Sequence, residues 1–166
     1  LMPNKIEQMF PELWVDEDSE DGKNINESPL IQTHLDRYRR KHSYSYNKLN
    51  NSSAGDKLIS QFNNLLNNDL NVIVVNFIDI LSHAKTDSKM VRELAQDEAA
   101  YRSLILSWFR HSSVKELFRR LSMTDYKVMI TTDHGSIMVN KAVKIAGDKN
   151  TNTNLRYKLG RNLGFN

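Results

Sequence analysis

Apolar residues recur every three or four positions in several stretches of the chain, which is the spacing of amphipathic helices. We expect one helix to open at Ser28, with this serine as N-cap and the following proline in the first turn. Ser53 and Ser113 are each followed three residues later by an acidic residue, a pair that predicts two more helix starts. A long helix is predicted over residues 89–111, and a short helical piece over residues 1–11.

A different spacing predicts strands between these helices. Residues 72–75 are an unbroken β-branched run, typical of a strand buried on both faces of a parallel sheet. Residues 127–130, in which a lysine precedes three apolar residues, are predicted to form a second buried strand. Tyr44 and Tyr46 alternate with polar residues and suggest a short edge strand, and residues 136–140 could form another. The order of elements predicts an α/β fold with a mostly parallel sheet flanked by helices.

Length and composition narrow the class of protein. The 166 residues fit one domain with a core of its own, and no apolar run approaches the roughly 20 residues of a membrane span. We therefore expect no membrane insertion. The chain has no cysteine, which excludes disulfides and thiolate metal sites and fits a reducing compartment. Any metal must be held by histidine and carboxylate, which favours zinc, manganese or magnesium.

Charge is unevenly distributed, although the formal net charge is only +3. Residues 12–27 are strongly acidic, and we interpret them as a solvated loop. Residues 141–166 are basic, which favours an anionic partner such as phosphate or forms a second charged solvent face. The cations at residues 37–41 could contact nucleic acid. A solvated helix end is favoured there because we find no aromatic interleaving and no DNA-binding motif.

Two segments carry candidate metal chemistry. In each, an aspartate and a histidine follow an apolar run: Asp79 with His83, and Asp133 with His134. Ligands in α/β sheets lie outside the carboxyl ends of the strands, so the two pairs could converge there. Asp79 and His83 are one helical turn apart and can face a single ion if a turn follows the strand. Carboxylate and imidazole are ligands that two-metal hydrolases use.

Both pairs also have simpler interpretations. Asp79 can be a turn-forming or capping residue with His83 an exposed ring, and Asp133-His134-Gly135 can be a polar turn. Three further cations, Arg156, Lys158 and Arg161, follow in a polar segment with a tyrosine and glycines. Arginine forks and lysine charges commonly hold phosphate, but a solvated basic segment remains an equal alternative.

These segments together resemble a known family. Thr131-Thr-Asp-His-Gly135 is similar to the Asp-His-Gly signature of the alkaline phosphatase superfamily, and residues 76–83 are similar to its Asp-x-x-x-His metal motif. The stretch 147–161, with its Arg-Tyr-Lys sequence, resembles the PglZ domain. This stretch also closely resembles the form found in PorX-type bacterial response regulators, where a receiver domain precedes a PglZ effector.

The resemblance implies a partial alkaline phosphatase-like (PglZ) domain spanning residues 1–166. It implies that Asp79 and His83 are ligands of one metal, and Asp133 and His134 ligands of a second. It also implies hydrolysis of a phosphate-containing substrate with two zinc ions, manganese being possible. Arg156, Lys158 and Arg161 would hold the substrate. In the family's setting the protein is cytoplasmic, with a receiver domain and a sensor kinase as partners.

The resemblance also leads us to expect that the receiver domain and the nucleophile lie in segments before Leu1. We therefore expect these 166 residues to show no turnover of a nitrophenyl phosphodiester by themselves. Two alternatives stay open. One is a non-enzymatic regulatory module that binds a protein in a two-component signalling system. The other, weaker, is nucleic-acid binding, with nucleic acid also possible as a substrate.

Overall fold

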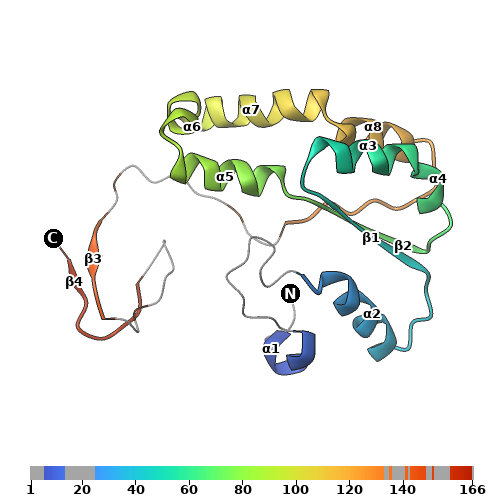
Figure 1. The fold of residues 1–166 in the computed structure, drawn as a ribbon, viewed down its shortest axis with the longest axis horizontal. Helices are drawn as coiled ribbons and strands as arrows, with labels where there is room; N and C mark the ends of the chain where they lie inside the picture. Colours follow the sequence, from blue (N-terminus) through green and yellow to red (C-terminus); the bar gives the residue numbers. More distant parts are fainter. Residues whose placement is uncertain are drawn as a thin grey trace. The chain divides into compact units, whose positions relative to one another are not determined.

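A computed structural model describes residues 6–13, 25–132, 135, 141, 143–148, 151 and 158–165. The chain divides into two compact units, Leu1–Tyr126 and Lys127–Asn166, which are described separately. The first unit contains a small sheet with helices on both faces (Figure 1). Short helical pieces precede these, α1 (Ile6–Met9) and the 3₁₀ turn η1 (Pro11–Leu13).

The sheet of the first unit pairs β1 (Tyr44–Leu49) with β2 (Leu70–Val75) in parallel, in a register that sets Tyr44 beside Leu70 and Leu49 beside Val75. This confirms the predicted parallel α/β architecture and the edge strand at the two tyrosines. The crossover between the strands carries two helices, α3 (Ser52–Ser60) and α4 (Phe62–Leu65). Parallel strands need such a crossover, because the chain must return to the end of the sheet where the first strand began before the second strand can start.

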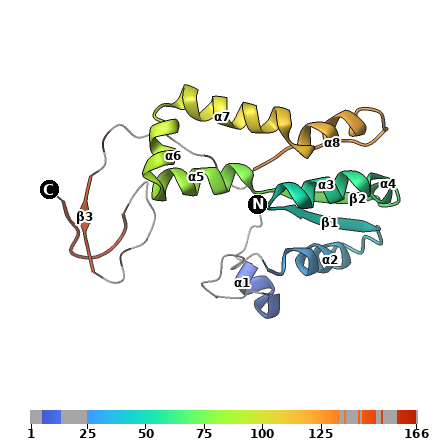
Figure 2. The ribbon, with the colours of Figure 1, turned by 45° about the horizontal axis from the view of Figure 1, so that its top comes forward.

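One face of the sheet is covered by α2 (Glu27–Arg37), and α3 lies on the other (Figure 2). Alternation along β1 explains the contacts with α2, because residues two apart point to the same face. The Tyr44 hydroxyl donates to the carbonyl of Ser28 at 3.2 Å, and the Tyr46 hydroxyl donates to the carboxylate of Glu27. Burial and this bond to Glu27 raise the pKa of Tyr46.

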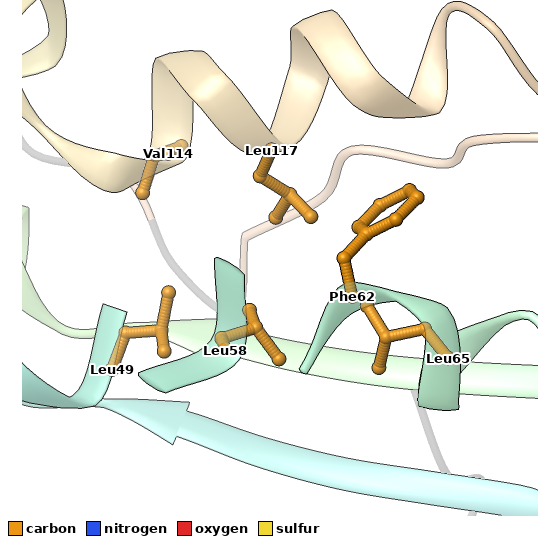
Figure 3. Close-up of a cluster of buried hydrophobic side chains, with 6 residues drawn as sticks. All are labelled: Leu49, Leu58, Phe62, Leu65, Val114 and Leu117. Carbon is orange, nitrogen blue, oxygen red and sulfur yellow. The ribbon is translucent and has the colours of Figure 1, made fainter. Parts of the chain in front are cut away.

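The core lies on the opposite face, between the sheet and α8 (Ser113–Leu121). Six buried side chains from β1, α3, α4 and α8 form it (Figure 3): Leu49, Leu58, Phe62, Leu65, Val114 and Leu117. Helices α3 and α8 approach closely at Gly55, where an added Cβ would lie 1.8 Å from Ser113 Oγ. The absence of a side chain at Gly55 therefore lets the two helices pack.

Three further helices differ from the expected pattern. The chain after β2 enters α5 (Phe77–Asp87), a full helix rather than a short turn. The single helix predicted over residues 89–111 is divided into α6 (Lys89–Leu94) and α7 (Glu98–His111). The division occurs where the side chain of Asp97 accepts a hydrogen bond from the Ala100 N–H, because this N-cap starts a new helix.

The N-caps also differ from the serines that the sequence suggested. Asn26 precedes α2, Asn51 caps α3 by accepting from the Ala54 N–H at 2.9 Å, and Ser112 precedes α8. At each end of the acidic loop predicted over residues 12–27, the structure describes a residue in a helical element. The η1 turn includes Glu12, and α2 already begins at Glu27; residues 14–24 lie outside the described ranges.

The second unit does not contain the strand predicted over residues 127–130. These residues form no regular structure, and Val128, Met129 and Ile130 are 51%, 89% and 78% exposed. The unit contains β3 (Ile145–Ala146) paired antiparallel with β4 (Gly164–Phe165). The strand suggested over residues 136–140 lies outside the described residues. Within the described ranges, every helix is too short or too polar to cross a membrane.

Candidate metal centre

The start of α5 is held in place by the end of the sheet and by α7. At the end of β2, the Asn76 N–H donates to the carbonyl of Leu49 at 3.3 Å, and its side-chain amide donates to Asn50 Oδ1 at 2.8 Å. The ring of Phe77 stacks on that of Trp108 in α7, with centroids 4.2 Å apart and planes 1° from parallel. The first turn of α5 is therefore fixed on two sides.

Asp79 lies in this first turn, and His83 lies one turn further along the same side of the helix. Asp79 Oδ1 and His83 Nε2 are 3.6 Å apart, and the two side chains are 51% and 75% exposed. A carboxylate in the first turn is favoured by the positive end of the helix dipole. The sequence spacing had predicted this shared side, although it placed Asp79 at a strand end and not within a helix.

The separation of the pair is compatible with a shared metal ion. Two ligand atoms bound to one tetrahedral zinc at ~2.1 Å lie about 3.4 Å apart, close to the observed distance. The exposure of both side chains leaves space for further ligands. The same geometry is also that of an ordinary Asp–His ion pair at i,i+4, so distance alone does not separate the two interpretations.

Further ligands are not found beside this pair in the described part of the chain. No group of three or more histidine and carboxylate side chains comes together among the described residues. Asp133 and His134 lie outside those residues, as does Arg156, while their neighbours Thr132 and Gly135 are described. The predicted convergence of the two Asp–His pairs therefore stays a prediction.

The structure describes two of the three candidate phosphate-binding cations. Lys158 is half-buried, and Arg161 is exposed at a cavity of about 490 Å³ that Asp148, Leu159 and Gly160 also line. A carboxylate thus shares the cavity with the guanidinium of Arg161. Among the described residues, the charged groups that line this cavity are therefore one cation, Arg161, and one acid, Asp148.

A comparison with protein families identifies the family of this chain, which the geometry alone does not show. Residues 1–166 match the BREX system PglZ alkaline phosphatase-like domain, and the match includes both Asp–His segments and the Arg-Tyr-Lys segment. The chain belongs to the PglZ family. This PglZ domain therefore has an alkaline phosphatase-like, phosphoesterase-type fold, in agreement with its parallel strands flanked by helices. A comparison with curated proteins found no match.

Sequence reasoning missed the side chains that position α5 in this PglZ domain. Besides Trp108, Tyr101 of α7 contributes, since its hydroxyl donates to the carbonyl of Ile78 at 3.4 Å. The ammonium of Lys85 lies over the ring of Tyr101, 5.3 Å from its centroid. Tyr101 and Trp108 were recognisable as an apolar stripe seven residues apart. Their contact with the first turn of α5 was not, because α5 itself was not predicted.

Proposed function

We propose that this PglZ domain is part of a metal-dependent phosphoesterase and supplies ligands to two metal ions. Asp79 and His83 bind one ion, and Asp133 and His134 bind the other. Zinc fits this histidine and carboxylate set, and manganese is the alternative. The observation that carries the proposal is the Asp79–His83 pair, held 3.6 Å apart on an anchored helical turn in a domain of alkaline phosphatase-like family.

The ions would neutralise charge on the phosphoryl oxygens and activate the attacking group. The residues of this chain would bind and orient the ions, and the cations Arg156, Lys158 and Arg161 would hold the substrate phosphate. The resemblance of residues 147–161 to PorX-type regulators supports a setting in two-component signalling, with a receiver domain and a sensor kinase as partners. In that setting the protein would be cytoplasmic.

Calorimetric titration of the chain with zinc tests the Asp79–His83 site. We expect Asp79→Ala and His83→Ala each to weaken zinc binding at one site by about 10- to 100-fold or more, since even partners of metal ligands have effects of this size. Glu98→Ala is a matched control, because it removes an exposed i,i+4 ion pair with Arg102 from α7 and no proposed ligand.

The controls decide between a metal site and an ordinary ion pair. If Asp79→Ala and His83→Ala bind zinc as the unmodified chain does, the pair is an ion pair only and the proposal is wrong. An equal loss in Glu98→Ala would contradict it as well, because the effect would then come from helix stability and not from the ligands.

A further inference from the structure

The last turn of α2 and the residues after it form the most cationic exposed surface in the described part of the chain. This basic turn, residues 37–41, contains Arg37, Tyr38, Arg39, Arg40 and Lys41, all of which are exposed. It extends from the last residue of α2 towards the start of β1 and precedes His42. Four cations in five residues give a locally strong positive potential in a chain whose formal charge is only +3.

The backbone of the basic turn places an arginine where a glycine would be more stable. The Arg40 N–H donates to the carbonyl of Leu35 at 2.8 Å, and the Arg39 N–H donates to that of Asp36 at 2.9 Å. These two bonds are those of a Schellman helix end, in which the residue at position 39 adopts left-handed backbone angles. Arg39 has φ 54°, a conformation that costs a side-chain-bearing residue more than glycine. Helix termination therefore does not explain the arginine.

Neighbouring carboxylates are engaged elsewhere. Asp36 accepts a hydrogen bond from Gln32 Nε2 at 3.0 Å. Asp69 accepts from the N–H and hydroxyl of Ser43, both at 3.0 Å, and lies 3.6 Å from His42. Among the described residues, Arg39, Arg40 and Lys41 form no ion pair. The helix dipole favours cations only within the last turn, so it accounts for Arg37 and not for Lys41.

An aromatic ring lies among these cations, which the sequence argument against nucleic acid overlooked. Tyr38 is 69% exposed, and one face of its ring stacks on His34 of α2, with centroids 6.2 Å apart and planes 11° from parallel. The ring is thus supported from one side while most of it stays accessible. Cations beside an exposed, supported aromatic ring are the features that bind single strands, by phosphate attraction and base stacking.

We propose that the basic turn binds single-stranded nucleic acid, with a base stacked on Tyr38 and phosphates held by Arg39, Arg40 and Lys41. This surface is separate from the Asp79–His83 pair. The turn precedes β1, whereas Asp79 and His83 follow the end of β2, and the parallel register sets these at opposite ends of the sheet (Figure 1). The proposal therefore stands or fails independently of the proposed enzymatic function.

The test measures binding of a fluorescent oligothymidylate to the chain by anisotropy over a series of salt concentrations. We expect affinity to fall as salt rises, and Arg39→Gly or Lys41→Gln each to reduce the slope of log affinity against log salt by about 0.7. Tyr38→Leu should weaken binding about fivefold or more at every salt concentration, because it removes stacking and no charge. Lys57→Gln, an exposed lysine of α3, is the matched charge control.

Arg39→Gly also separates lost binding from lost folding. Glycine adopts the observed φ without strain, so this variant should melt at a higher temperature than the unmodified chain while binding more weakly. Absence of salt-dependent binding overturns the proposal, as does an equal slope change in Lys57→Gln. Unchanged affinity in Tyr38→Leu, or equally tight binding of duplex DNA, also overturns it, because the surface would then attract any polyanion.

Discussion

At the scale of single residues, Glu116 in α8 binds two arginine side chains of the same helix. Its carboxylate accepts two bonds from Arg119, at 2.6 and 2.7 Å, and one from Arg120 Nε at 2.8 Å. Arg120 in turn donates to the carbonyl of Ile59 at 2.8 Å and lies over the ring of Phe62. Glu116 therefore helps to orient an arginine that joins α8 to α3 and the core.

The hydrogen bonds from Arg119, followed by those from Arg120, lower the pKa of Glu116 from 4.5 to about 2. A lowered folded-state pKa contributes stability above the unfolded value, and this contribution is lost as the pH falls towards 2. In urea unfolding from pH 6 to about pH 2, we expect Glu116→Gln to lose less stability than the unmodified chain. If the free energies of unfolding of the two proteins instead fall in parallel as the pH is lowered, this account of Glu116 is wrong.

At the scale of elements, helix starts give a direct comparison between sequence and structure. Ser53 was the cap that the sequence favoured, but Asn51 accepts the capping bond from Ala54. We expect Asn51→Ala to lower the free energy of unfolding by about 1 kcal/mol, the usual value of an N-cap. Ser53→Ala should change it by less than about 0.5 kcal/mol, as at other exposed positions. Urea unfolding measures both, and the reverse order would show that the cap is Ser53.

Strands and helix faces were predictable where the local pattern was decisive. The β-branched run at residues 72–75 identified β2, and the alternating tyrosines identified β1. Helix α5 was missed because Phe77 and Ile78 resume the apolar run of β2 after a single polar residue, Asn76, so the apolar spacing shows no clear change at the start of the helix. The break between α6 and α7 did carry a signal, the aspartate at position 97, which an apolar stripe over residues 89–111 concealed.

The run at residues 127–130 shows a different limit of sequence patterns. It was predicted as a buried strand, yet Met129 and Ile130 are mostly exposed. An apolar, β-branched run indicates that a segment can be buried in a sheet. It does not say which strand would pair with it, because strand pairing depends on partners distant in sequence. Three of its four residues, Val128, Met129 and Ile130, are apolar, but the environment of the run was not predictable from this composition.

At the scale of the whole molecule, the same limit applies to the candidate site. The shared side of Asp79 and His83 followed from their spacing of four residues, which any helical turn provides. The meeting of this pair with Asp133 and His134 depends on long-range packing, and no local pattern determines it. Family membership, which covers residues 1–166, supplies the reason to expect both pairs in one site.

The central claim is that the two Asp–His pairs bind metal, and metal content tests it most directly. Elemental analysis of the purified protein that carries this domain should find bound zinc or manganese. Asp79→Ala and His134→Ala should each lower the metal-to-protein ratio, since each removes a ligand of a different ion. Circular dichroism would confirm that both variants fold. Unchanged metal content in both folded variants would contradict the account.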